Sequence, residues 1–265
     1  MKKNFPLRGG NTFFGCHDSK HKYLIIMKKL NLASVLMISV MIFGITSCGI
    51  LQQVIEPQDE KQKTFNVKNF DQLEMGNAFH INVVQGATFK VKAVGDSRDI
   101  DDLLVEERNG TLEVSFRNNW RLRRYQMDID IEMPALKGVD FSGASISNIK
   151  GFDNTSDLKI NLSGASKSFF LTNVKTYDID LSGASTLEIE GKSQKIYAEM
   201  SGASTFNAFS TATDEASLNL SGASSGRVNV SQQLKVRASG ASKVRYRGNA
   251  KVDSDLSGSS NVEKE

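Results

Sequence analysis

The sequence predicts an all-β protein: a β-solenoid of about seven coils, preceded by an N-terminal β region. Three observations support this fold class. The motif Ser-Gly-Ala-Ser occurs six times and Ser-Gly-Ser-Ser once, beginning at Ser142 and ending at Ser260. Apolar and polar residues alternate before each copy, and a second short alternation follows it. Each repeat spans roughly twenty residues, which is the length of one solenoid coil.

The alternation before each motif predicts a strand with one inward face. The residue just before each motif is apolar in every repeat: Phe141, Leu162, Leu181, Met200, Leu220, Ala238 and Leu256. The residue two positions earlier is also apolar, except in the last repeat: Val139, Ile160, Ile179, Ala198, Leu218, Val236 and then Ser254. Polar residues lie between these two columns. A period of two therefore predicts stacked strands that share an apolar core.

The motif itself predicts a corner. Glycine adopts positive φ without steric cost, and the small Ala and Ser side chains let successive corners stack. The expected turn glycines are Gly143, Gly164, Gly183, Gly202, Gly222, Gly240 and Gly258. We expect the serines to form two outward or corner-lining ladders that hydrogen-bond to one another or to the turn backbone.

The region before the repeats, residues 64–135, also predicts strands. Alternating segments are TFNVKNF, FHINVV, FKVKAV, TLEVSF and MDIDIEM. Asn109-Gly110 predicts a tight hairpin turn, because a type I′ turn needs positive φ at both central residues. Ser97–Glu107 alone has helical spacing, which predicts a short helix or an irregular loop. The repeats then define a solenoid over residues 136–262.

The start of the chain predicts export and lipidation. Residues 27–47 combine two lysines, an apolar run and small residues, as in a signal peptide, so residues 1–26 are expected to be a mis-assigned upstream extension. Ile45-Thr46-Ser47-Cys48 resembles a lipobox, which predicts an acylated Cys48 and anchoring to a membrane. Gly49 after the cysteine favours the outer membrane, on either its periplasmic or its surface face. Residues 48–63 are polar and predict a flexible tether.

The charge of the expected mature chain argues against nucleic acid as a partner. Residues 1–47 hold seven Lys/Arg and one Asp, so 26 basic and 29 acidic residues remain, a net charge near −3. Cys16 lies upstream of the signal and Cys48 is the acylation site, which leaves no thiol for a disulfide, zinc or catalysis. No cofactor is expected.

The sequence does not predict a catalytic residue. Residues 222–226 match the G-x-S-x-G elbow of hydrolases, but no histidine follows them, and the match arises from a repeat that continues Ser-Gly. The polar column Asp140, Asn161, Asp180, Glu199 and Asn219 offers oxygen ligands, although a solvated strand face explains it better than calcium. His80 is expected to point outward from its strand. We therefore predict a protein that is not an enzyme and holds no metal.

One segment combines basic and aromatic residues and is the candidate ligand contact. It contains Arg117, Trp120, Arg121, Arg123, Arg124 and Tyr125. Guanidinium groups and aromatic rings together bind anionic glycans or lipid headgroups. The alternative is a hairpin loop whose aromatic residues cap the end of the stack.

These segments resemble a known family. FDQLEMGNAFHINVVQG at residues 70–86, the later NGTLEVSF and the strands separated by SGAS are similar to the "putative auto-transporter adhesin, head GIN domain" family. The resemblance covers nearly all of residues 64–262 and implies a right-handed solenoid in an envelope lipoprotein with a role in adhesion. It carries over no binding residues.

The function expected from these features is non-catalytic binding at the cell envelope, with a glycan, matrix material or an envelope protein as partner. A polysaccharide-acting enzyme of the β-helix type is one alternative, for which the nearest basic cluster is Lys235, Arg237, Lys243, Arg245 and Arg247. A periplasm-facing structural or signalling partner is the other.

Overall fold

The computed structural model describes residues 59–265, apart from residues 119, 122 and 154. Within these residues the structure has one sheet system of 17 strands and a single short helix, which confirms the predicted fold class. The expected extension, signal peptide, Cys48 and most of the tether lie outside the described residues. In the described part, no helix is both long and apolar enough to cross a membrane.

The solenoid consists of rungs, each with one strand before a corner, the corner, and one strand after it. The strands before the corners stack in parallel in the order β6 (Thr111–Phe116), β2 (Gln72–Met75), β8 (Gly138–Phe141), β10 (Thr155–Leu162), the ends of β11 to β14, and β16 (Lys251–Leu256). The strands after the corners stack in parallel in the order β7 (Asp128–Met133), β3 (His80–Gln85), β9 (Ile146–Lys150), the starts of β11 to β14, β15 (Lys243–Arg247) and β17 (Asn261–Lys264).

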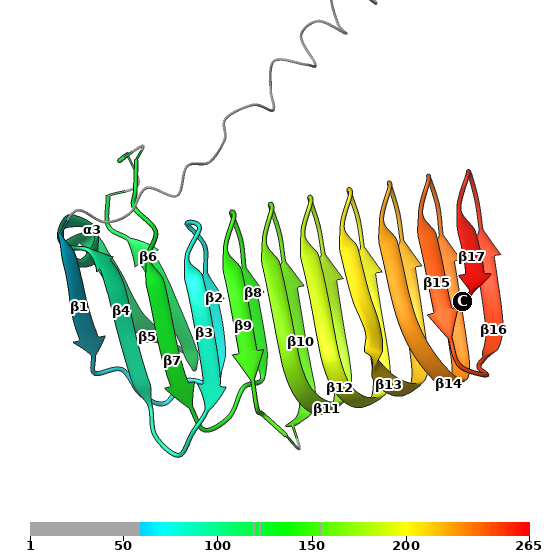
Figure 1. Ribbon diagram of the computed structural model, residues 1–265, viewed down its shortest axis with the longest axis horizontal. Coiled ribbons are helices and arrows are strands. Elements are labelled where there is room, and N and C mark those ends of the chain that lie inside the picture. The colour runs from blue at the N-terminus through cyan, green and yellow to red at the C-terminus, as the bar shows by residue number, and fades with distance from the viewer. Residues whose placement is uncertain (1–58, 119, 122, 154) are drawn as a thin grey trace, which may run out of the picture. The chain divides into compact units, whose positions relative to one another are not determined.

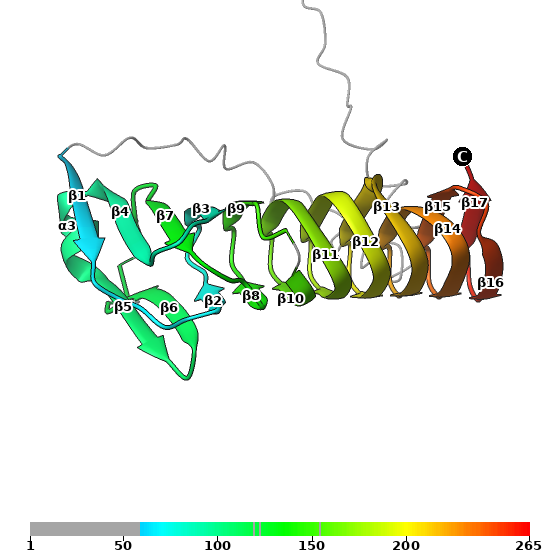
Figure 2. The same ribbon diagram turned by 90° about the horizontal axis from the view of Figure 1, so that it is seen from below.

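Four long strands pass from one stack to the other. They are β11 (Lys167–Leu181), β12 (Thr186–Met200), β13 (Thr205–Leu220) and β14 (Ser225–Ala238). Each of them bends opposite the corners, so that its start lies in one stack and its end in the other (Figure 2). All the tight corners therefore lie along one edge of the stack (Figure 1).

Each predicted turn glycine lies in the left-handed region, with φ between 69° and 76°. The corners stack directly on one another: the amide of Ala203 donates to the carbonyl of Gly183 at 2.8 Å, and Ala184 donates to Gly164 at 2.7 Å. A side chain on the glycine would collide with this backbone, since a Cβ on Gly202 would lie 2.5 Å from the oxygen of Gly183. The corner therefore requires glycine for its conformation and for the close approach.

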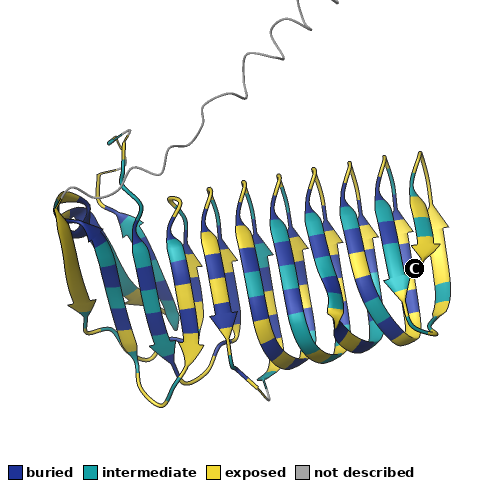
Figure 3. Cartoon of the chain, viewed as in Figure 1, coloured by how far each residue is buried: buried dark blue, intermediate teal, exposed yellow. Residues whose placement is uncertain are grey.

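The predicted apolar columns are buried, with two exceptions in the last rung. Every predicted position from the first repeat to the sixth belongs to one continuous core, but Leu256 is 40% exposed and Ser254 is exposed. Figure 3 shows the alternating buried and exposed bands along the strands and the mostly exposed β16 and β17. These two strands have a neighbour on one side only, so nothing within the described residues covers the end of the core there.

The serine ladders were expected to be outward or corner-lining, and the second serine of the motif follows the corner-lining alternative. The final serine of the first six motifs is at most 1% exposed: Ser145, Ser166, Ser185, Ser204, Ser224 and Ser242. The strand resumes its alternation at this residue, which turns its small side chain inward. Several of these hydroxyls donate to the carbonyl three residues earlier, for example Ser224 to Ser221 at 2.8 Å. The ladder is thus part of the core, where most of its hydroxyls bond within the turn or to the serine of a neighbouring rung, and the hydroxyl of Ser185 has no partner among the described residues.

The N-terminal region joins the same stack. Strands β2 and β3 pair with β8 and β9, and β6 and β7 pair with the other side of β2 and β3, so hydrogen bonding is continuous across residue 136. Antiparallel pairs cover the far side: β4 (Lys90–Asp96) lies beside β7 and β1 (Glu60–Phe65), and β5 (Leu103–Arg108) lies beside β6. Asn109 and Gly110 both have positive φ in the β5–β6 turn, which confirms the predicted hairpin.

Two predicted segments of this region differ in the structure. The strand expected at TFNVKNF lies earlier, at β1, because pairing with β4 fixes it there although its residues are mostly exposed. Phe70 is nevertheless buried and packs onto the core from an irregular segment. The segment Ser97–Glu107 divides into the helix α3 (Ser97–Asp102) and the start of β5, because Leu103 begins the pairing with β6.

Candidate functional site

The candidate contact segment forms the corner of the first rung. It connects β6 to β7, and we call residues 117–127 the β6–β7 loop. Other rungs turn through four residues at this position, either Gly76–Phe79 or the SGAS-type motif, whereas this rung turns through eleven residues. The loop starts from a bond between the amide of Arg117 and the carbonyl of Asp102 at 3.0 Å, and it ends where Met127 accepts from the amide of His80 at 2.9 Å. It projects from the same edge as the other corners (Figure 1).

Two buried carboxylates beneath the loop fix its position. Asp99 and Asp102 lie on α3, three residues apart, on the side that also buries Ile100. Asp99 is fully buried and accepts from the backbone amide of Tyr125 at 2.9 Å. The helix thus directs both acidic side chains toward the loop. Because their charges are buried, they require positively charged partners.

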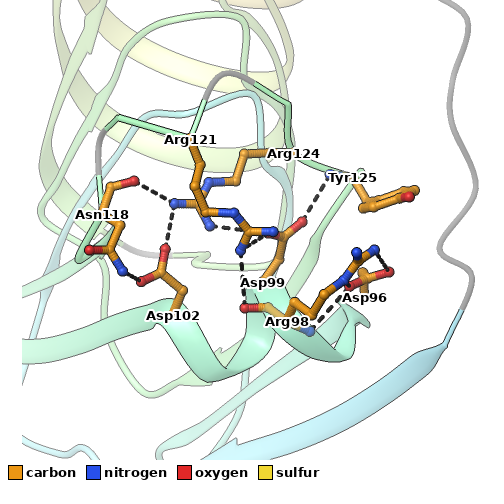
Figure 4. A network of polar contacts seen from close by, with 8 residues as sticks. All are labelled: Asp96, Arg98, Asp99, Asp102, Asn118, Arg121, Arg124 and Tyr125. Atoms are coloured by element: carbon orange, nitrogen blue, oxygen red, sulfur yellow. Dashed lines mark hydrogen bonds and ion pairs between the residues drawn. The ribbon is translucent and has the colours of Figure 1, made fainter.

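The partners are two arginines of the loop, as Figure 4 shows. Arg121 and Arg124 each place an Nη1 atom 3.1 Å from Oδ1 of Asp99. Arg124 also donates to Asp102, which accepts a further bond from the side chain of Asn118. The guanidinium carbon of Arg124 lies 3.8 Å from the centre of the Phe116 ring, which adds a cation–π contact. These contacts hold both ends of the loop against α3.

The network lowers the pKa of one carboxyl. Burial alone would raise the pKa of Asp102, but hydrogen bonds from Arg124 and Asn118 and the charge of Arg124 outweigh it, so this pKa lies below its ordinary value. At the start of α3, Asp96 caps the helix by accepting from the amide of Arg98 at 3.1 Å and pairs with its guanidinium at 2.9 Å. The side chain of Arg98 then lies 5.4 Å from the ring of Tyr125.

The six predicted contact residues therefore divide into two groups. Arg121 and Arg124 face the protein and hold the loop, together with the backbone amide of Tyr125, whose ring lies beside Arg98. Trp120 is 76% exposed, and Arg117 and Arg123 are also exposed. Within the described residues, the side chains of these last three have no hydrogen bond or ion pair. The surface that remains available to a ligand is an indole with two free guanidinium groups.

Sequence reasoning missed the acidic half of this arrangement. Asp99 and Asp102 were part of a segment recognised only for its helical spacing. Their spacing of three residues, beside the apolar Ile100 and Leu103, was the available signal, since it places carboxylates near the inward side of a helix. A buried acid predicts a basic partner elsewhere, and the segment 117–124, with four arginines in eight residues, was one concentrated source in the sequence.

The other predicted features lie apart from this loop. Ser224 of the G-x-S-x-G match is buried in a corner between two strands, without the strand–turn–helix context of a hydrolase. The column from Asp140 to Asn219 is aligned in register and mostly exposed, and the described residues hold no cluster of His, Cys, Asp or Glu suited to a metal ion. His80 lies 2.8 Å from the side-chain amide of Gln126.

The basic cluster considered for a lyase is engaged in ion pairs at the last coils. Lys243 lies 3.3 Å and Arg245 3.8 Å from Glu263, and Arg247 pairs with Glu265 at 3.3 Å. Lys235 and Arg237 are exposed on β14. Opposite charges thus neutralise part of this cluster, which makes it a weak candidate for transition-state stabilisation.

Comparison with known proteins gives a family and a fold. A family model described as "Putative auto-transporter adhesin, head GIN domain" matches residues 69–250. A structure from Bacteroides fragilis, described as a putative adhesin, is 19% identical with a TM-score of 0.72, over 79% of this chain and 98% of that chain. One from Parabacteroides distasonis, described as a putative lipid binding protein, is 15% identical with a TM-score of 0.62, over 79% and 98%. No curated protein matches the sequence.

Proposed function

Because the chain belongs to the "putative auto-transporter adhesin, head GIN domain" family, we propose that it is a non-catalytic binding protein anchored to the cell envelope, with the β6–β7 loop as its contact surface. The observation that carries this proposal is the exposed Trp120 on a loop held from below by buried ion pairs. A preorganised aromatic side chain binds with little loss of conformational entropy.

The charge of the exposed surface selects the ligand. Arg117 and Arg123 are positively charged and lie three residues before and after Trp120 in the sequence, and the segment from Arg117 to Tyr125 contains no acidic residue. The charges of Arg121 and Arg124 are neutralised by their ion pairs with α3. The guanidinium groups of Arg117 and Arg123 therefore determine how strongly the loop attracts an anionic ligand. An anionic glycan or a lipid headgroup fits this surface, because guanidinium groups hold carboxylates and phosphates with paired hydrogen bonds.

The chain enters the β region beside this loop. The carbonyl of Asp59 accepts from the amide of Ser97 at 2.9 Å, and Lys61 pairs with Asp101 at 2.8 Å, so β1 starts against α3. The proposed lipid anchor at Cys48 precedes this point. Within the described residues, the start of β1 and the β6–β7 loop therefore both contact α3.

The contact surface is tested with the full chain, whose single tryptophan reports on the loop. We expect polygalacturonate or phosphatidylglycerol vesicles to change the Trp120 emission, and added salt to weaken the effect because these charges are exposed. Replacing Arg117 and Arg123 together by Gln should weaken binding about tenfold. The matched control replaces Arg237 of β14 and Lys251 of β16, two exposed basic residues outside the loop, by Gln and should keep full affinity.

Equal weakening in both double variants, or an unchanged Trp120 emission with every anionic probe, would contradict the proposed contact.

The anchor is tested separately in intact cells. Cys48→Ala should abolish incorporation of labelled palmitate and move the protein from the membrane fraction to the soluble fraction. Protease treatment of intact cells then distinguishes a surface orientation, in which the β region is cleaved, from a periplasmic one, in which it is protected.

A further inference from the structure

A groove with a volume of about 780 Å³ lies on the opposite side of the stack from the row of corners. One wall is the connection between β7 and β8, residues 134–137, and the other is formed by Asp153 and the first residues of β10. The floor consists of outward residues of β11 and β12, among them Thr176, Asp178 and Tyr197. The connection between β7 and β8, which forms the first wall, lies near the lower edge of Figure 1.

The two walls are tied together by one amide side chain. Gln85, at the end of β3, accepts a hydrogen bond from the amide of Phe152 at 2.9 Å and donates one to the carbonyl of Pro134 at 3.1 Å. Phe152 is fully buried and has a φ of 57°, a conformation that bulky residues rarely adopt. Strained positions of this kind persist where the surrounding structure determines them, and they concentrate at binding sites. The positions of the two walls are therefore fixed by contacts within the protein.

The lining offers both stacking and hydrogen-bonding groups. Tyr197 is 46% exposed and is the only aromatic residue among the described outward positions of this face from β10 to β14. Lys159, Asp178 and Tyr197 are aligned neighbours on three adjacent strands. Within the described residues, the side chains of Asp157, Lys159 and Asp178 have no hydrogen bond or ion pair. These free groups can accept from and donate to a ligand.

The charge of the lining excludes a strongly anionic ligand. Three aspartates and two lysines line the groove, and Lys137 is already paired with Asp71 at 2.6 Å. The apolar part comes from Pro134, Ala135 and Leu136 together with the ring of Tyr197. A ligand that matches this lining has apolar faces and hydroxyl edges and carries no negative charge. A pyranose ring has this character, whereas an acyl chain requires an enclosed apolar cavity.

A second hollow, of about 280 Å³, continues on the far side of Tyr197. It is lined by residues of β12, β13 and β14, including Ser217, Gln233 and Lys235. Tyr197 thus lies between two hollows that follow one another along the stack. We propose that this surface binds a neutral polysaccharide along the stack, with one sugar ring on Tyr197. This site is separate from the β6–β7 loop and differs from it in the charge of its ligand.

The experiment uses the full chain and three oligosaccharides: cellohexaose and maltohexaose, which are neutral, and hexagalacturonate, which is anionic. Calorimetric titration should show binding of a neutral hexasaccharide, and Tyr197→Ala should weaken it by about tenfold. Tyr197→Phe should retain most of the affinity if the ring supplies the contact. The matched control is Leu171→Ala, another exposed apolar residue of the neighbouring strand β11, which should bind normally.

We expect Tyr197→Ala to have unchanged thermal stability, because the side chain points outward. A loss of binding in this stable variant would then result from the missing ring. The proposal is overturned if neither neutral hexasaccharide binds, if Tyr197→Ala binds as well as the unaltered chain, or if hexagalacturonate binds this surface more tightly. A groove ligand should leave the emission of Trp120 unchanged. The proposal for the groove can therefore be contradicted while the proposed contact at the β6–β7 loop is supported, and the reverse also holds.

Discussion

The repeated coils and the N-terminal end of the same stack are stabilised by different interactions. In the coils, the core is apolar apart from small hydroxyl groups, and the corners fit because glycine backbones touch. At the N-terminal end, three aspartates of α3 and its cap are buried beside arginines. The stability of the coils thus depends on close packing, whereas the stability of the N-terminal end depends on the neutralisation of buried charges. Substitutions that test shape and charge separately should therefore affect different parts of the molecule.

The largest effect is expected from a side chain at a central corner. Gly202→Val places a branched residue at a φ of 72°, with its Cβ 2.5 Å from the oxygen of Gly183. The conformational cost and the collision together predict a loss of about 4 kcal/mol in the free energy of unfolding. Urea unfolding followed by circular dichroism measures this loss.

The control for this prediction is another glycine of the coils. Gly226 does not have positive φ, and a Cβ there would lie 3.6 Å from Leu218, an ordinary contact distance. We expect Gly226→Ala to change the free energy of unfolding by less than about 1 kcal/mol. Similar losses for the two variants would show that close stacking of the corners does not limit stability.

A smaller loss is expected from removing one buried charge at the N-terminal end. Asp99→Asn leaves Arg121 and Arg124 without their shared carboxylate, which predicts a loss of about 2 kcal/mol. Because these arginines hold the β6–β7 loop, the Trp120 emission should change as well. Asp101→Asn is the matched control, since its pair with Lys61 is exposed and should contribute little. An unchanged emission in Asp99→Asn would show that the ion pairs do not position the loop.

Acid should loosen the N-terminal end before the central coils. The pKa of Asp102 is lowered because the bonds and charge of Arg124 and Asn118 outweigh its burial, so its contribution is present above the ordinary value of 3.8 and is lost as the pH falls through the lower folded value. The pKa of Asp130 on β7 is lowered in the same way, because Lys92 and Asn82 outweigh the effect of burial. Its contribution to stability is therefore also lost in acid. Amide exchange at about pH 2.5 and about pH 6 should show the difference. Loosening of β12 and β13 at the same pH as α3 would contradict this prediction.

The smallest effects are expected within the buried serine ladder. Ser224 donates to the carbonyl of Ser221 at 2.8 Å and lies 3.2 Å from the hydroxyl of Ser204, so Ser224→Ala should cost about 1 kcal/mol. The hydroxyl of Ser185 has no partner within the described residues, so Ser185→Ala should change stability by less than about 0.5 kcal/mol. Equal costs in thermal unfolding would contradict this difference.

The repeats could be predicted from the sequence because every coil repeats the same local signal. Alternation around each motif gave the strands, their inward faces and the corner glycines. The last rung departs from this pattern, because burial of Leu256 would need a further neighbour and β16 has only one. Local periodicity does not reveal where a stack ends.

The N-terminal end was harder to predict, because its arrangement depends on contacts between distant segments. Strand β1 has no apolar period, and only its pairing with β4 forms it. The order of the rungs also departs from the order of the chain, since β6 and β7 lie outside β2 and β3. The sequence identified the residues of the contact segment. It did not show which of them bind the protein and which stay exposed, because that depends on the buried acids of α3.

The corner motif also bears on how such a protein can change over generations. Consecutive corner glycines are 18 to 21 residues apart, and the extra residues are absorbed by register shifts near the opposite bend, such as those between Glu188 and Gly191 and between Ala208 and Ala212. Recombination between two repeats would therefore remove or add one whole coil and rejoin equivalent positions. The length of the molecule would change in steps of about 4.8 Å, one strand spacing at a time, while the two proposed contact surfaces kept their local structure.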